Sequence, residues 1–306
     1  MATGGTVGTG FAFRDELIRH GVLIEGGAAG MCAYSGAFED TVQRIDRLVA
    51  RCGSVDAPDV MRFSPLLHRS YVERSGYLES FPQLAGSVHS FTGDERAHRE
   101  LIQAVQDGRN WAAHLPPTAG VLTPAACYPV YPLLSGTLPA GGRLVDVMSY
   151  CFRHEPSDDP ARLQMFRMHE HVRVADAASA VAWRDRWIHR AAAITATLDL
   201  GAHLVVASDA FFGRTGMLLA ENQRVQRLKL ELVTPIASDE RPTAIISLNY
   251  HQDHFGELFA IRTAEGTIAH SACVGFGLER MALALYRQHG ANRSAWPCSA
   301  REALEL

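Results

Sequence analysis

The chain has 306 residues, of which 47% are hydrophobic and 20% are charged, enough for one large globular domain or two modest ones. Its formal net charge is −4, whereas a protein that holds a nucleic-acid backbone over a large surface usually carries a basic excess. The cysteines contain no C-x-x-C pair, which disfavours zinc fingers and a disulfide framework. No secretory signal and no run of about 18 apolar residues is present, so we expect a cytoplasmic protein that does not enter a membrane.

The first half of the chain predicts helices separated by irregular segments. Residues 1–10 are rich in Gly and Thr and are expected to be disordered; residues 11–306 are expected to form a single domain, in which 11–118 elaborate the core. Apolar residues recur at helical spacing from Phe38 to Val49. A second helix is predicted from Asp94 to Val105, capped by Thr92 or Asp94. Between these helices, residues 53–92 indicate loops and short strands. After the second helix, residues 120–134 indicate an irregular edge strand.

The second half predicts a sheet with covering helices. Two strands, 144–152 and 164–174, are joined by a polar loop of turn residues. The longest helical pattern runs from Ala177 to Leu200, and further strands are predicted at 227–233, 244–250 and 258–262. A last helix is predicted to open at Gly275 and to run to about His289. Strands separated by long loops favour an α+β fold with an antiparallel sheet.

Two stretches carry the chemistry. The first is Cys151-Phe152-Arg153-His154-Glu155, followed by Arg162-Leu163-Gln164-Met165-Phe166-Arg167-Met168, and the second is Val274-Gly275-Phe276-Gly277-Leu278-Glu279-Arg280. In this order and at this separation they resemble motifs 2 and 3 of the class II aminoacyl-tRNA synthetases. That resemblance implies an antiparallel sheet flanked by helices, and an arginine from each motif on the phosphates of ATP.

The resemblance assigns roles to residues of the two motifs. Arg153 would contact the α-phosphate and the substrate carboxylate, and Arg280 the γ-phosphate. Gly275 and Gly277 would let the backbone pass close to the nucleotide. The remaining contacts would come from Glu155 to the adenine amino group, Arg162 near the γ-phosphate with its neighbour Leu163, and Phe166 stacked under adenine. Arginine suits this work because it stays charged and its planar fork binds two oxygens at once.

The strands before motif 3 resemble those of seryl-tRNA synthetases. They offer Lys229 and the backbone of Ala244, Ile245, Ile246 and Ser247 as ATP contacts, although Lys229 also fits a solvated strand face. Seryl enzymes have a metal-binding glutamate near the position of Ala244. Glu231 would then carry Mg²⁺ alone, or the phosphates would hold it.

Cys127, Glu170 and Cys273 gain meaning only from a closer resemblance. Zinc-dependent seryl-tRNA synthetases of methanogenic archaea, and their truncated bacterial relatives, the amino acid:[carrier protein] ligases, bind zinc through two Cys and one Glu in these places. Three protein ligands leave an open position, which the amine of an amino acid would fill. Glu170 is also a substrate-binding candidate, because many class II enzymes place at this position a residue that reads the substrate's amino group. His169 and His171 flank Glu170 and should point to the opposite face of their strand, where packing is the simpler role. Cys151 is expected to be a packing residue.

The acceptor of the activated amino acid is inferred from two parts of tRNA synthetases that this sequence does not predict. No long basic helical arm is predicted before Cys127, and the stretch after Arg280 is too short for an anticodon-binding domain. This pattern resembles the carrier-protein ligases, which pass glycine or alanine from AMP to the phosphopantetheine thiol of a small acidic carrier protein. No tRNA is expected. A tRNA-charging homologue and a non-catalytic paralogue are the alternatives.

Two surfaces are predicted from the same family. Met217-Leu218-Leu219 with Arg224 and Arg227 would form a helix for the acidic carrier, although a solvated helix explains the pattern equally well. Class II cores generally pair, so a homodimer is expected, with its interface near residues 120–134.

Overall fold

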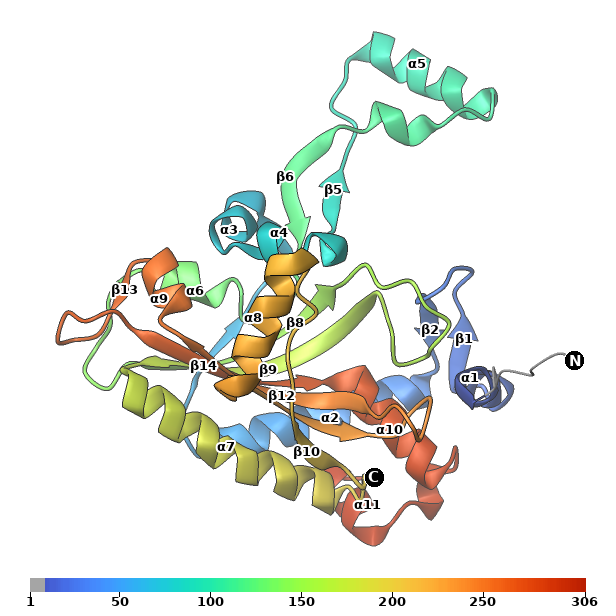
Figure 1. The fold of residues 1–306 in the computed structure, drawn as a ribbon. Coiled ribbons are helices and arrows are strands. Elements are labelled where there is room, and N and C mark those ends of the chain that lie inside the picture. The colour runs from blue at the N-terminus through green and yellow to red at the C-terminus, as the bar shows by residue number, and fades with distance from the viewer. Residues whose placement is uncertain (1–8) are drawn as a thin grey trace, which may run out of the picture.

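A seven-stranded sheet forms the centre of the molecule (Figure 1). The computed structural model describes residues 9–306, and side chains from residue 12 onward. The strand order is β10-β11-β12-β14-β9-β8-β3, and every neighbouring pair is antiparallel except β3 and β8, which are parallel. The strands are β10 (His203–Val206), β11 (Lys229–Thr234), β12 (Thr243–Gln252), β14 (His270–Gly277), β9 (Met165–Ala175), β8 (Arg143–Phe152) and β3 (Asp59–Arg62). The α+β fold with a largely antiparallel sheet is therefore confirmed.

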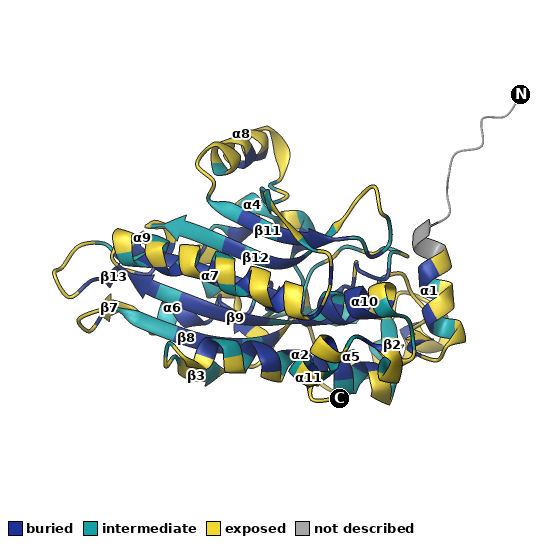
Figure 2. Cartoon of the chain, turned by 90° about the horizontal axis from the view of Figure 1, so that it is seen from below, coloured by how far each residue is buried: buried dark blue, intermediate teal, exposed yellow. Residues whose placement is uncertain are grey.

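Two long helices, α2 (Gly36–Ser54) and α7 (Ala177–Thr197), cover one face of this sheet together with α10 (Leu278–His289) and α11 (Cys298–Leu304) (Figures 1 and 2). Their apolar sides join the sheet in one core, which includes Phe38, Trp187 and Phe276. Ser35 caps α2 by accepting a hydrogen bond from the Phe38 amide at 3.2 Å, and Asp176 caps α7 through the Ser179 amide at 2.9 Å.

The other face carries a different set of elements and leaves room for a site. These are α3 (Arg69–Arg74), α4 (Tyr77–Ser80), α6 (Val130–Leu133), α8 (Gly213–Val225), α9 (His254–Leu258) and the pair β7 (Gly136–Thr137) and β13 (Ile261–Arg262). Near the N-terminus, α1 (Thr9–Arg19) is followed by the hairpin β1 (Leu23–Glu25) and β2 (Cys32–Tyr34). Residues 1–8 of the expected disordered segment lie outside the described residues, and α1 already begins at Thr9.

A separate three-stranded sheet carries an arm that projects from the body (Figure 1). It consists of β4 (Leu66–His68), β5 (Ser87–His89) and β6 (Pro117–Leu122), and the arm holds α5 (Glu95–Gln106) and the short 3₁₀ turn Trp111–His114. Another 3₁₀ turn, Pro82–Leu84, precedes β5, and Arg293–Ala295 precedes α11. Asp94, not Thr92, caps α5, because its side chain accepts from the Ala97 amide at 3.0 Å.

Three predicted elements differ from the structure. The last helix begins at Leu278 rather than Gly275, because Gly275 and Gly277 continue β14 and pair with Glu170 and Met168 of β9. Residues 258–262 end a helix and contribute only two residues to a strand. Residues 120–134 leave β6 at Leu122 and then form α6, whose first residue follows a proline in helical conformation.

None of the helices among residues 9–306 combines the length and apolarity that a membrane crossing requires.

Candidate active site

A cavity of about 660 Å³ lies over the face of the sheet that the long helices leave uncovered. Its walls come from β9, β11, β12 and β14, from the loop after β8, and from α4 and α8. It brings together most of the residues that the sequence predicted: Cys127, Arg153, Glu155, Arg162, Phe166, Glu170, Lys229, Glu231, Ala244, Ile245, Ser247, Cys273 and Arg280. Segments more than a hundred residues apart thus meet in one place.

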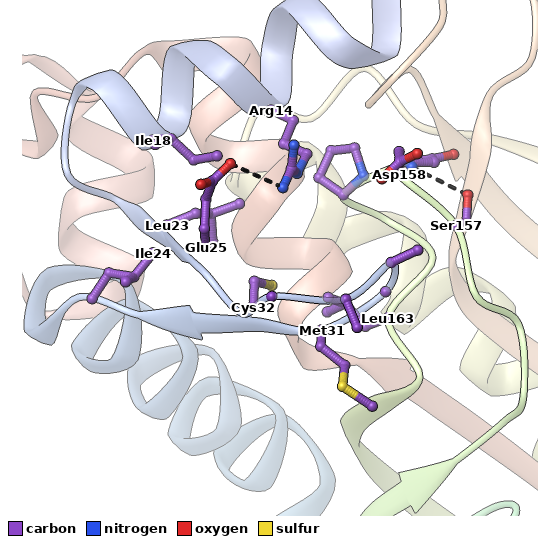
Figure 3. A pocket seen from close by; sticks show the side chains of 16 residues that line it. Arg14, Ile18, Leu23, Ile24, Glu25, Met31, Cys32, Ser157, Asp158 and Leu163 are labelled. Atoms are coloured by element: carbon purple, nitrogen blue, oxygen red, sulfur yellow. Dashed lines mark hydrogen bonds and ion pairs between the residues drawn. The ribbon is translucent and has the colours of Figure 1, made fainter. Parts of the chain in front are cut away.

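Two predicted residues do not line this cavity. The side chain of Ile246 is buried in the core on the other face of the sheet, so only its backbone is available to a ligand there. Leu163 faces a smaller pocket of about 270 Å³ between α1, the β1–β2 hairpin and residues 157–160 (Figure 3). Arg14 and Glu25 form an ion pair at the edge of that pocket, with 3.5 Å between their side chains.

The two motif arginines face the large cavity without carboxylate partners. Arg153 donates from Nε to the Pro124 carbonyl at 3.3 Å, and Arg280 donates to the carbonyls of Ala161 at 2.9 Å and Ala244 at 3.1 Å. Neither forms an ion pair with any carboxylate of residues 12–306. Burial lowers the pKa of Arg280 to about 10, and the nearby charges of Arg153 and Arg162 act in the same direction. Guanidinium groups held in this way would be stabilised by an anion.

The motif 2 residues lie partly outside the strands. β8 ends at Phe152, so Arg153 and Glu155 belong to the following loop. The Arg153 amide donates to the Gln164 carbonyl at 3.0 Å, which fixes the loop against the start of β9. The Arg153 guanidinium lies over the Phe166 ring, 5.6 Å from its centroid. Glu155 and Arg162 approach each other to 3.5 Å.

Lys229 does not lie on a solvated strand face, the alternative that the sequence left open, but belongs to a partly buried ion-pair group. Its ammonium contacts the carboxylate of Asp209 and lies 3.3 Å from that of Glu231. Burial opposes the positive charge, but the two carboxylates outweigh it and raise the pKa of Lys229. Ser247 donates to Glu231 at 3.2 Å. Asp209 was missed by the sequence analysis, since it lies in a loop before α8 that no motif marks.

Cys127, Glu170 and Cys273 converge at the inner end of the cavity. All three are buried, and one ligand atom from each lies within 4.8 Å of the other two. Cys127 comes from the segment before α6, Glu170 from β9 and Cys273 from the adjacent β14. The Ala126 amide donates to Glu170 Oε1 at 2.8 Å and orients the carboxyl group.

Cys127, Glu170 and Cys273 lie so close together that each affects the pKa of its neighbours. The pKa of Cys273 lies well below its ordinary value because its sulfur accepts a hydrogen bond from Cys127, and the same bond, together with burial, raises the pKa of Cys127. Burial and the charge at Cys273 raise the pKa of Glu170 to about 8. Three buried groups that resist simultaneous ionisation suit a cation that would neutralise them, and two sulfurs with one carboxylate are a zinc-type donor set.

Two further polar residues border the Cys–Glu–Cys group. Asn249 donates to the Cys273 sulfur at 3.4 Å, and His251 Nε2 lies 3.6 Å from the same atom. Both were missed. Because residues alternate between faces along a strand, Ser247, Asn249 and His251 share the cavity face of β12, and this alternation was the available signal.

The chain was compared with known proteins. No protein-family model matches it. It is 42% identical over 282 residues to amino acid–[acyl-carrier-protein] ligase 1 of Bradyrhizobium diazoefficiens, covering 92% of this chain and 86% of that protein. Ligase 2 of the same organism is 43% identical over 284 residues, covering 92% of this chain and 85% of that protein. The chain belongs to the amino acid–[acyl-carrier-protein] ligase family.

More distant relatives of this ligase-family chain are synthetases. The type-2 serine–tRNA ligase of Methanopyrus kandleri is 28% identical over 191 residues, which cover 58% of this chain and 36% of that enzyme. A crystal structure of the M. kandleri enzyme with a tRNA superposes with a TM-score of 0.82 at 22% identity, over 96% of this chain and 60% of that one. The seryl-tRNA synthetase of Pyrococcus horikoshii, solved with ATP, gives 0.70 at 12% identity, over 96% of this chain and 62% of that one. These likenesses confirm the class II synthetase fold.

Proposed function

We propose that this chain uses ATP to activate a small amino acid as aminoacyl-AMP and then transfers the aminoacyl group to the phosphopantetheine thiol of a carrier protein. The ligases that share its family are named for this kind of acceptor. The observation that carries the proposal is the meeting, in one cavity, of two arginines free of carboxylates and the Cys127–Glu170–Cys273 group. The arginines can hold phosphates, and the Cys–Glu–Cys group can hold a metal ion that binds an amine.

The activation step needs orientation and charge neutralisation more than proton transfer. A carboxylate oxygen of the amino acid attacks the α-phosphorus of ATP, and pyrophosphate leaves. The carboxylate is ionised near neutral pH, so no base is required. Arg153, which lines the same cavity as the Cys–Glu–Cys group, would bind the α-phosphate and the attacking carboxylate together. Arg280 would hold the γ-phosphate, and Phe166 would pack under adenine.

A zinc ion fits the inner end of the cavity. Cys127, Glu170 and Cys273 would hold it, and when bound it would supply an open position for an uncharged amine. The amino acid would then be fixed at both ends, by its amine and by its carboxylate at Arg153. The rings of Tyr128, His251 and Phe255 line the cavity beside this group, which favours glycine or alanine over larger substrates.

Magnesium would accompany ATP. Glu231 is the proposed protein ligand, and Lys229 and Ser247 already orient its carboxylate. Because these partners occupy part of its capacity to accept, the phosphates would supply most of the remaining oxygens.

The carrier is proposed to dock on α8. Met217, Leu218 and Val225 are exposed on this helix, and the helix borders the cavity mouth. Arg224 lies 3.0 Å from Glu221 and is half exposed, so it can still meet an acidic partner. Charge reversal at Arg224 and Arg227 should slow transfer to the carrier and leave amino-acid-dependent pyrophosphate exchange unchanged. Unchanged transfer would eliminate this role of the helix.

A homodimer is also proposed. In residues 120–134, the expected interface, Val130 and Tyr131 are buried within their own chain, whereas Leu133 is 61% exposed. A second edge is also available. The outer edge of β3 has no partner strand in the described part of the chain, and Val60 there is 67% exposed. An open strand edge with an exposed apolar residue favours pairing. Light scattering of Val60→Lys should show a monomer if this edge is used and a dimer if it is not.

The decisive test offers two acceptors in parallel. The purified chain is incubated with ATP, Mg²⁺ and labelled glycine or alanine, together with holo-carrier protein or bulk tRNA. Label on the carrier that hydroxylamine removes, with none on tRNA, is expected. Label on tRNA would replace the proposal with tRNA charging. Absence of both label and pyrophosphate exchange would favour a non-catalytic paralogue.

A further inference from the structure

A second group of buried metal-binding side chains lies behind the candidate active site. Asp146 of β8 and His169 and His171 of β9 are each buried, and one ligand atom from each lies within 4.8 Å of the other two. Because successive residues of a strand point to opposite faces, the two histidines face away from Glu170, toward α2 and α7. The adenylation chemistry described above uses none of these three residues.

Two of the three separations between these side chains lie near those between the ligands of a tetrahedral ion. His169 Nε2 lies 3.1 Å from Asp146 Oδ2, and His171 Nδ1 lies 3.9 Å from the same oxygen. Zinc bonds of about 2.0–2.1 Å to nitrogen and oxygen at tetrahedral angles separate neighbouring ligands by about 3.3 Å. The observed separations lie on either side of that value, so small side-chain movements would complete the site.

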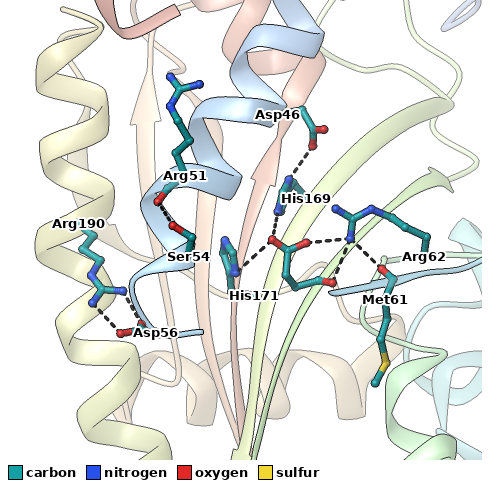
Figure 4. Close-up of polar contacts among 10 residues, drawn as sticks. Asp46, Arg51, Ser54, Asp56, Met61, Arg62, His169, His171 and Arg190 are labelled. Carbon is teal, nitrogen blue, oxygen red and sulfur yellow. Dashed lines mark hydrogen bonds and ion pairs between the residues drawn. The ribbon is translucent and has the colours of Figure 1, made fainter. Parts of the chain in front are cut away.

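His169 is held in the orientation of a metal ligand. Asp46 of α2 lies 2.6 Å from its Nδ1 (Figure 4). This leaves Nε2 directed at Asp146. A carboxylate on the far nitrogen is the usual way in which proteins orient a ligating histidine. Arg62 donates to Asp146 Oδ1 at 2.8 Å, so Oδ2 is the oxygen that faces the histidines.

His171 is the side chain of this group that most needs a ligand. Both of its ring nitrogens are buried, and neither has a hydrogen-bond partner among the side chains of residues 12–306 or the backbone of residues 9–306. The ring is fixed by stacking on Trp187, with 4.8 Å between centroids, and by Gly53, where a Cβ atom would lie 2.1 Å from His171 Cε1. A buried imidazole without partners is costly, and its immobile ring already directs Nδ1 toward Asp146.

We propose that Asp146, His169 and His171 bind a second divalent transition-metal ion, with zinc as the best match. Two imidazoles and one carboxylate favour zinc or a similar ion over Mg²⁺ or Ca²⁺, which prefer oxygen ligands. The ion takes the place of the proton on His169 Nε2 and leaves a fourth position for a small ligand such as water. Through Asp46 it joins α2 to the central strands, and it does not depend on the proposed reaction.

The test removes the two cysteines of the Cys–Glu–Cys group so that only the second site remains. Cys127→Ser/Cys273→Ser protein is stripped with a chelator and titrated with Co²⁺ and with Zn²⁺, and its metal content is measured after gel filtration. One bound ion is expected, with cobalt ligand-field bands in the visible range but no thiolate charge-transfer band, because the second site has no sulfur. Thermal unfolding should move to higher temperature with the ion present.

Variants assign the ion to its ligands. His171→Gln in the same background should lose the ion, whereas His289→Gln, which changes a histidine at the end of α10, should keep it. If His171→Gln does not fold by circular dichroism, Asp146→Asn serves in its place. A background protein that binds no cobalt at micromolar concentration, or a folded ligand variant that keeps the ion, overturns the proposal. Pyrophosphate exchange by the wild-type chain reports on the proposed function separately.

Discussion

Glu170 of β9 lies directly opposite Gly275 of β14, so a candidate metal ligand faces a residue that has no side chain. A Cβ atom at Gly275 would lie 3.3 Å from Glu170 Cγ and 3.4 Å from Met168 Cε. The glycine of motif 3 therefore does more than let the backbone pass near a nucleotide. It leaves the space that the Glu170 side chain needs in order to reach Cys127 and Cys273.

Gly275→Ala should displace Glu170 by a few tenths of an ångström and weaken zinc binding. We expect the zinc affinity to fall by about tenfold, which corresponds to about 1.4 kcal/mol. A competitive titration against a chromophoric chelator measures this. Gly277→Ala is the matched control for metal content, because its nearest contacts would be 3.7 Å away, an ordinary separation. Equal zinc affinity in both variants would show that Gly275 does not position Glu170.

Arg280→Ala should reduce amino-acid-dependent ATP–pyrophosphate exchange by about a hundredfold to a thousandfold, the usual effect of removing one stabiliser of transition-state charge. The fold should survive, since Arg280 bonds only to two backbone carbonyls and to no carboxylate in the described part of the chain. Arg287→Ala, on an exposed turn of the same helix and 3.4 Å from Asp239, should retain exchange. Full activity in Arg280→Ala would contradict the assignment of motif 3.

Sequence and structure agree most closely where a pattern is local. The strand pair 144–152 and 164–174, the helix from Phe38, and the opposite orientation of Glu170 and its flanking histidines all follow from periodicity. The helix start at Gly275 was misplaced because two glycines close together usually interrupt the pattern of a strand. Here they extend a strand whose partner lies about a hundred residues earlier. Ladder pairing of this kind is not visible in a single sequence.

The missed site residues have a similar explanation. Asp209 becomes important only because the loop before α8 folds back onto Lys229. Asn249 and His251 gain their place from the pairing of β12 with β14, which sets Asn249 opposite Cys273. The resemblance to known enzymes supplied the ligands of the Cys–Glu–Cys group. It offered nothing for Asp146, His169 and His171 on the other face of the sheet.

Arg167→Ala should destabilise the fold by about 3–5 kcal/mol, the usual cost of leaving a buried charge without its partner. Arg167 donates to Glu279 at 2.7 Å and to both oxygens of Glu39, and Glu279 is buried. Urea denaturation measures the change. Arg143→Ala breaks an exposed pair with Asp59 and should cost about 0–1 kcal/mol. Similar losses for the two variants would mean that burial does not decide the strength of the Arg167 pairs.

The Asp56–Arg190 pair should make stability depend on pH in the acid range. Arg190 donates to Asp56 Oδ1 at 2.9 Å and thereby ties the segment after α2 to α7. That hydrogen bond lowers the pKa of Asp56 below its ordinary value, despite the opposing effect of partial burial. A carboxyl group whose pKa is lower in the folded state stabilises the fold above its unfolded pKa of about 3.9 and loses this contribution as the pH falls through the folded value. Asp56→Asn should therefore reduce the free energy of unfolding near about pH 6 and have a smaller effect near about pH 3. Urea denaturation at both pH values tests this, and an equal loss at the two would show that the charge of Asp56 does not contribute.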